Sequence, residues 1–177
     1  MAGITFTVEI DEAEASAKLS DMVSRMERPI GFYKGVGEYL TEVAIPRNFA
    51  AETGPDGSPW ASLRPLTVAR REAKGQTPIK ILRASGAMAA GINYAASDSQ
   101  VQIGSPAIQA AVMQFGAAQG SFGAAIGRTR PTDKRPKSQD YFAHLPWGDI
   151  PARPFLGLSP ADEEKIIRIA ARWLEVE

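Results

Sequence analysis

Ile150-Pro151-Ala152-Arg153-Pro154-Phe155-Leu156-Gly157 is the stretch of sequence that decides the fold. Its two prolines remove backbone donors and restrict the residues before them, so it fits neither a regular helix nor a central strand. We predict a stiff extended connector that fixes Arg153 and Phe155 as candidate interface residues. Arg153 could meet a carboxylate of a neighbouring chain, or could instead bond to helix carbonyls of its own domain.

A helix is predicted directly after this connector. Ser159-Pro160-Ala161-Asp162 combines an N-cap serine with proline at the first helical position. Apolar residues then recur at helical spacing and predict one buried face. They are Ile166, Ile167, Ala170, Trp173 and Leu174.

The N-terminal third predicts a strand followed by two helices. Residues 4–10 alternate apolar and polar side chains, which is typical of a half-buried strand, and Asp11 with Glu14 then forms an N-cap signal. Two runs with helical spacing follow, and Pro29 predicts a break near Arg28. A further perturbation is expected at Pro46. The apolar positions are Leu19, Met22, Val23, Met26 and Ile30, then Phe32, Tyr33, Val36, Tyr39, Leu40 and Val43.

Short elements fill the centre of the chain. Residues 53–60 are rich in turn residues and end in Trp60, a candidate core or interface aromatic. A basic helix is predicted over 67–74, and a short helix is predicted to open at Ser85-Gly86. Residues 92–103 predict a β-hairpin, and 107–115 an apolar helix that Gly116 closes after Phe115.

These elements predict a single α+β domain over residues 1–177, with long N-terminal helices packed on a small, mainly antiparallel sheet. Residues 117–149 are expected to form a long inserted loop or arm, rich in Gly, Pro and basic residues. Because aromatic residues lie within it, we expect this arm to order against a partner. The interface candidates of the whole chain are Trp60, Phe115, Phe122, Tyr141, Phe142, Trp147, Arg153 and Phe155.

The amino-acid composition limits the classes of protein to which this chain can belong. The 177 residues carry 44% apolar side chains, a formal net charge of zero and no cysteine. This excludes disulfides and thiolate chemistry, and no stretch approaches the roughly 20 apolar residues of a membrane helix. No secretory signal is expected at the first residues, so we predict a chain made in cytoplasm and carried elsewhere only by an assembly.

Charge is distributed unevenly along the chain. Residues 1–60 hold ten acids and five bases, whereas residues 61–83 hold six bases and one acid. A ring with head-to-tail contacts could use this segregation, because one face of each subunit must meet a different face of its neighbour.

Catalytic chemistry finds little support in the sequence. His144 is the only histidine, no Gly-x-Ser-x-Gly elbow is present, and the glycines of 116–123 do not have the spacing of a phosphate-binding loop. No enzyme activity, metal site or cofactor is therefore predicted. A basic group could contact nucleic-acid phosphates, or could be a solvated loop. It comprises Arg128, Arg130, Lys134, Arg135 and Lys137.

An ordered set of motifs resembles a known family. It consists of Asn48-Phe49, Gly54-Pro-Asp-Gly-Ser-Pro-Trp60, Ile81-Leu-Arg-Ala-Ser-Gly86, Val101-Gln-Ile-Gly104, Gln114-Phe-Gly116 and Ile150–Gly157. This order is similar to that of the phage virion morphogenesis family and spans roughly Met22 to Leu174. Members commonly carry Tyr-Ala and His-Gln-Phe-Gly where this chain has Gln109-Ala110 and Met113-Gln-Phe-Gly116. The missing tyrosine and histidine indicate that these positions pack rather than catalyse.

The resemblance implies a structural protein of a tailed-phage virion at the head–tail junction, made in the host cytoplasm. Its role would be tail completion, tail termination or a place in the neck. The expected partners are further copies in a ring, predicted to be a hexamer, and the adjoining neck and tail-tube proteins, with non-specific contact to DNA in the lumen as a further possibility. The alternatives are a head-side connector, acting as adaptor or stopper, and a DNA-contacting module that uses residues 128–137.

Overall fold

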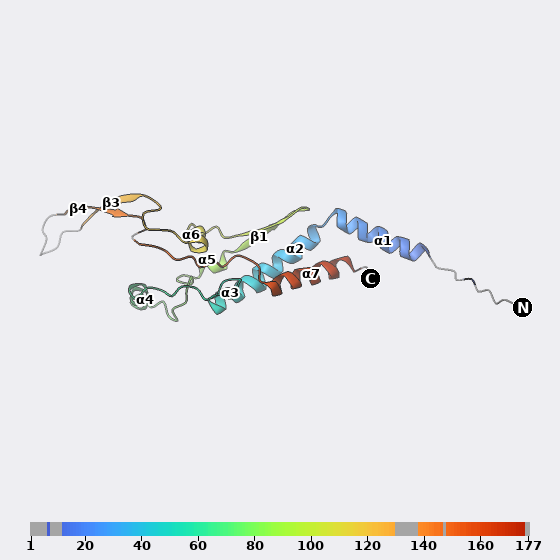
Figure 1. Ribbon diagram of the computed structural model, residues 1–177, viewed down its shortest axis with the longest axis horizontal. Helices are drawn as coiled ribbons and strands as arrows, with labels where there is room; N and C mark the ends of the chain where they lie inside the picture. Colours follow the sequence, from blue (N-terminus) through green and yellow to red (C-terminus); the bar gives the residue numbers. More distant parts are fainter. Residues whose placement is uncertain (1–6, 8–11, 130–137, 147, 176–177) are drawn as a thin grey trace, which may run out of the picture.

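The computed structural model describes residues 7, 12–129, 138–146 and 148–175 as an elongated α+β structure, which confirms the predicted class (Figure 1). The predicted strand at 4–10 and the Asp11 cap lie outside the described residues. The elements are α1 (Glu12–Glu27), α2 (Ile30–Tyr39), the π-helical η1 (Leu40–Ala44), α3 (Ile45–Ala51), α4 (Pro65–Glu72), α5 (Ala87–Ala90), β1 (Asn93–Ala96), β2 (Val101–Gly104), α6 (Ala110–Phe115), β3 (Ala124–Arg128), β4 (Asp140–His144) and α7 (Pro160–Leu174).

The elements α2, η1 and α3 follow one another without a break and form one helical rod (Figure 1). The prediction of a break near Arg28 is confirmed, because α1 ends at Glu27 and α2 begins at Ile30. Pro46 perturbs the rod as predicted, by way of a wide turn: the Ile45 N–H donates to the Leu40 carbonyl five residues earlier. Because proline has no N–H and its ring crowds the preceding turn, a π turn accommodates it without ending the helix.

One core cluster joins the rod to α7 and the first hairpin. Val36, Leu40 and Ala44 are buried there, with side chains of β2 and α7 packed against them. The hairpin predicted at 92–103 is confirmed, with β1 and β2 antiparallel. Gly37 is needed at this contact because a Cβ there would collide with the ring of Tyr94. Ile167, predicted on the buried face of α7, is exposed, and Ile169 packs into the cluster in its place.

A second core cluster lies where the connector 150–157 crosses α3. Phe49, Trp60 and Phe155 are its aromatic members, with Ile45 and Met88 beside them. The Phe49 ring meets Trp60 edge-on at 5.4 Å and Phe155 at 5.5 Å between centroids. This aromatic group fixes the connector, the turn at 53–60 and α3 relative to one another.

Residues 116–150 contain more regular structure than the predicted loop. Strands β3 and β4 pair antiparallel, from Ala124 opposite His144 to Arg128 opposite Asp140. Backbone bonds continue the ribbon toward its base, where Ala117 and Ile150 bond to each other reciprocally. This ribbon, formed by β3 and β4 above the Ala117–Ile150 bridge, is called the arm below. It projects at the end of the molecule opposite α1 (Figure 1).

Helix α1 buries none of its side chains in the part of the chain that the structure describes. The Arg25 guanidinium joins it to α7 by donating to the carbonyls of Trp173 and Glu175 at 2.9 and 3.1 Å. Of the two predicted N-terminal helical runs, only the second therefore packs against the sheet.

Truncation of Phe155 tests the aromatic cluster. Phe155 has no exposed surface, so Phe155→Ala should lower the free energy of unfolding by about 3–5 kcal/mol. Denaturant unfolding followed by tryptophan fluorescence measures this change. Phe115→Ala is the matched control, since the Phe115 ring is exposed and its loss should cost less than about 0.5 kcal/mol. Equal effects of the two variants would contradict the described core.

Candidate interaction surfaces

Side chains hold most of the connector 150–157, and its backbone also bonds to Ala117 through Ile150 and to the Met113 carbonyl through the Arg153 N–H. The Gln114 carboxamide donates to the Leu156 carbonyl at 2.9 Å and accepts from the Phe155 and Leu156 N–H groups at 3.0 Å each. The Trp60 indole N–H donates to the Pro154 carbonyl at 2.7 Å. These bonds satisfy backbone groups that the prolines exclude from a regular ladder.

Arg153 is bonded within its own domain. It is buried and donates from Nε to the Ala61 carbonyl at 2.7 Å and from Nη2 to the Ser62 carbonyl at 3.1 Å. Of the two roles predicted for Arg153, the intramolecular one is thus present, although the acceptors are loop carbonyls and not helix carbonyls. Burial and the nearby positive charge of Arg71 lower the pKa of Arg153 below its ordinary value.

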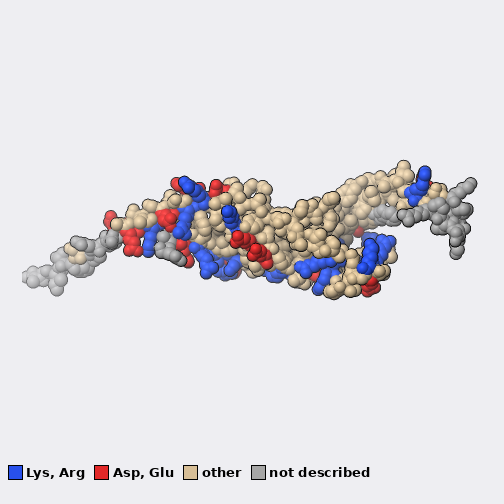
Figure 2. Space-filling view, turned by 180° about the vertical axis from the view of Figure 1, so that it is seen from behind, with Lys and Arg blue, Asp and Glu red and all other residues tan. Residues whose placement is uncertain are grey.

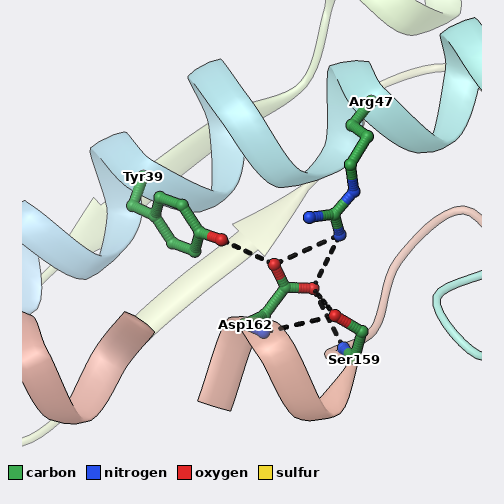
Figure 3. A network of polar contacts seen from close by, with 4 residues as sticks. All are labelled: Tyr39, Arg47, Ser159 and Asp162. Carbon is green, nitrogen blue, oxygen red and sulfur yellow. Dashed lines mark hydrogen bonds and ion pairs between the residues drawn. The ribbon is translucent and has the colours of Figure 1, made fainter. Parts of the chain in front are cut away.

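Asp162 is the most densely bonded side chain of the described structure (Figure 3). It is fully buried, and its carboxylate accepts from the Tyr39 hydroxyl at 2.7 Å and from Arg47 Nη2 at 2.9 and 3.2 Å. The Ser159 backbone N–H and hydroxyl donate to it at 2.9 and 2.6 Å. The Asp162 backbone N–H donates in return to the Ser159 hydroxyl oxygen at 3.2 Å, which closes a capping box. The network ties the start of α7 to the rod.

The charge of Asp162 is stabilised by this network. Burial by itself raises the pKa of Asp162, but the hydrogen bonds from Arg47, Ser159 and Tyr39 outweigh burial and hold that pKa far below its usual range. A carboxylate that stays ionised and has donors on both oxygens is a poor general acid or base. Asp162 is therefore a structural residue.

The arm exposes three of the seven aromatic residues predicted as interface candidates. Phe122, Tyr141 and Phe142 are exposed, whereas Trp147 lies outside the described residues. Phe115, on α6, is exposed as well. Trp60, Arg153 and Phe155 point into the domain, where they form the aromatic cluster and hold the connector. Whether the exposed residues contact a partner stays a prediction.

The predicted basic group is only partly described. Arg128 forms an ion pair with Asp140 across the arm at 2.7 Å, so its charge is balanced locally. Arg130, Lys134, Arg135 and Lys137 lie outside the described residues. His144 is exposed and meets Phe142 edge-on at 5.4 Å between ring centroids.

Two features of the structure could not be predicted from the sequence. The first is the role of Gln114, which belongs to the Gln114-Phe-Gly116 motif but whose bonds to the connector no sequence pattern indicated. The second is the exposed apolar face of α1, formed by Leu19, Val23 and Met26. Helical spacing revealed that face but predicted it to be buried.

In the structure, several of the sequence motifs meet at the connector, and comparison with known proteins identifies the family to which they point. A family model described as the phage virion morphogenesis family matches residues 10–175. No curated protein and no solved structure matches the chain. Within the described residues there is no group of three or more His, Cys, Asp or Glu side chains that could hold a metal ion. None of the described helices is long and apolar enough to cross a membrane.

Substitution of Asp162 tests the network. Asp162→Asn removes the charge and one acceptor oxygen, and should lower the free energy of unfolding at pH 7 by about 1.5–3 kcal/mol. Because the folded pKa is depressed, the stabilisation is fully present above the unfolded pKa of about 3.9 and is lost as the pH falls toward the folded value. The difference between wild type and variant should therefore be constant from pH 7 to about 5 and shrink below about pH 4.

Denaturant titrations over this pH range measure that difference. The exposed Asp98, in the turn between β1 and β2, provides the control variant Asp98→Asn, which should leave stability nearly unchanged. A difference for Asp162→Asn that grows as the pH falls below 4 would contradict the described charge state.

Proposed function

We propose, from the premise that the chain belongs to the phage virion morphogenesis family, that it is a tail-completion, tail-terminator or neck subunit that forms a ring at the head–tail junction. Family membership establishes a structural or assembly role in a phage particle. The finer role is the proposal, and it includes a single functional domain over 1–177, a hexameric ring, and adjoining neck and tail-tube proteins as partners.

The projecting arm is the observation that supports this proposal most. A two-stranded ribbon is marginally stable by itself in water, yet this one extends from the body with its large apolar side chains exposed. Such a surface is typical of a segment that is covered in an assembly. In a ring, the arm of each subunit would be covered by an adjoining chain.

A head-side connector, acting as adaptor or stopper, would use the same surfaces, and the position of the ring in the particle separates it from a tail-end subunit. A DNA-contacting module would use the basic residues of the arm. It would bind DNA with an affinity that falls steeply with salt concentration. The proposed ring subunit needs only weak, non-specific contact with DNA that passes through the lumen.

Variants of the arm test the proposed role in a phage whose genome encodes this chain. Without the chain, we expect electron micrographs of lysates to show heads and tails that are not joined. Complementation by wild type should restore joined particles. Phe122→Ser with Phe142→Ser should fold normally, because both rings are exposed, yet should reduce joined particles and infectivity to near the level without the chain.

Leu158→Ser is the matched control, since Leu158 is an exposed apolar residue outside the arm, beside Val36 and Ile166. It should restore joined particles as well as wild type does. Normal joining and infectivity in a phage that lacks the chain would refute the proposed function. Full activity of the arm variant would refute the role of the arm.

A further inference from the structure

We propose that α1 of one copy docks on the arm end of the next copy, with its apolar face against the arm and its free carboxylates toward three arginines at the arm's base. This inference rests on the ring proposed above and names the two surfaces that form each subunit–subunit contact.

The first surface is the apolar face of α1. Leu19, Val23 and Met26 are 62%, 55% and 63% exposed. Their spacing of four and three residues puts them on one face of the helix. A helix with such a face normally buries it, but α1 has no buried residue within the described chain. The face is therefore available to another molecule.

The second surface is one face of the arm. Ile126 and Phe142 are direct partners in the antiparallel register, so their side chains lie on the same face, and they are 77% and 68% exposed. On the opposite face Tyr141 folds over Gly127, where a Cβ would collide with the Tyr141 ring. Of the described cross-strand pairs of the arm, the one made of two large apolar side chains is Ile126 with Phe142, whereas the opposite face pairs Ala125 with Ala143.

Positive charge is concentrated beside the base of the arm. Arg64, Arg71 and Arg153 line a cavity of about 360 Å³ between α4 and the connector. No carboxylate of the described residues forms an ion pair with any of the three, and their bonds go to backbone carbonyls. Figure 2 shows Lys and Arg side chains gathered over α4, at the end of the molecule that carries the arm. Arg64 is exposed, Arg71 half-buried and Arg153 buried, and among the described residues Asp149 is the one acidic side chain that lines the cavity with them. Three cations beside a single carboxylate favour an anionic partner.

Helix α1 supplies the complementary charge. It carries four acids and two bases, and its two internal ion pairs leave Glu12 and Glu27 without a described partner. Because α1 and the arm lie at opposite ends of the molecule (Figure 1), one chain cannot bring them together. A second copy can, and a contact between two different surfaces continues from copy to copy until a ring closes. DNA would match the arginines but would leave the apolar face of α1 uncovered.

Cysteine pairs introduced into this cysteine-free chain test the contact in assembled particles. Val23→Cys with Phe142→Cys, treated with a short bis-maleimide, should give a ladder of covalent multimers that ends at the ring's copy number. Ser24→Cys with Phe142→Cys is the matched control, since Ser24 follows Val23 and points to another side of α1. It should give little cross-linking. Each single-cysteine variant should give none.

The arginines are tested in the Val23→Cys, Phe142→Cys background. Arg64→Gln with Arg71→Gln should reduce the cross-linked yield several-fold. Arg70→Gln with Lys74→Gln should not, because neither Arg70 of α4 nor Lys74, which follows α4, lines the cavity. Thermal melting checks that each variant is folded.

The outcomes separate this inference from the proposed function. Covalent dimers from Val23→Cys alone would indicate a twofold contact between α1 helices and would overturn the inference. Particles that contain a ring of this chain but give no ladder would overturn the inference and leave the proposed function in place. Particles that lack such a ring would overturn both.

Discussion

The Gln114 side chain holds the connector, and the rest of the structure depends on this interaction. Its amide bonds to the backbone of Phe155 and Leu156 on both the donor and the acceptor side, as a neighbouring strand would. The two prolines prevent a regular ladder along the connector, so side chains supply bonds beyond the backbone ones at Ile150 and Arg153. Gly116 follows at φ 74°, and a Cβ there would lie 2.8 Å from the Ile150 carbonyl. One short motif therefore sets the place of the connector, and with it the start of α7.

The position of the connector also explains where the apolar side chains are buried. Phe155 completes one aromatic cluster, and α7 completes the other core against the rod. Both clusters lie in the middle of an elongated chain, so neither α1 at one end nor the arm at the other contributes a fully buried residue. An elongated subunit with a stable centre and two apolar ends is suited to contacts with other chains. This is the physical basis of the proposed ring.

Local signals in the sequence predicted the local structure well. Ser159 and Asp162 form the capping box that their spacing indicated, and the hairpin of β1 and β2 lies where alternation placed it. The partners of Asp162 could not be predicted in this way, because Tyr39 and Arg47 come from a distant part of the chain. Strand β3, with the sequence Ala-Ala-Ile-Gly-Arg, was missed because alanine and glycine give little β-strand signal. For α1, periodicity identified an apolar face but could not show what covers it.

A density map of the head–tail junction in the intact particle tests the proposed ring most directly. The proposed ring requires several copies of this chain in a closed ring, with α1 of each copy against the arm of the next, and the arm's Phe142 buried between them. A single copy, isolated twofold dimers, or a ring in which α1 and the arm both face solvent would contradict it.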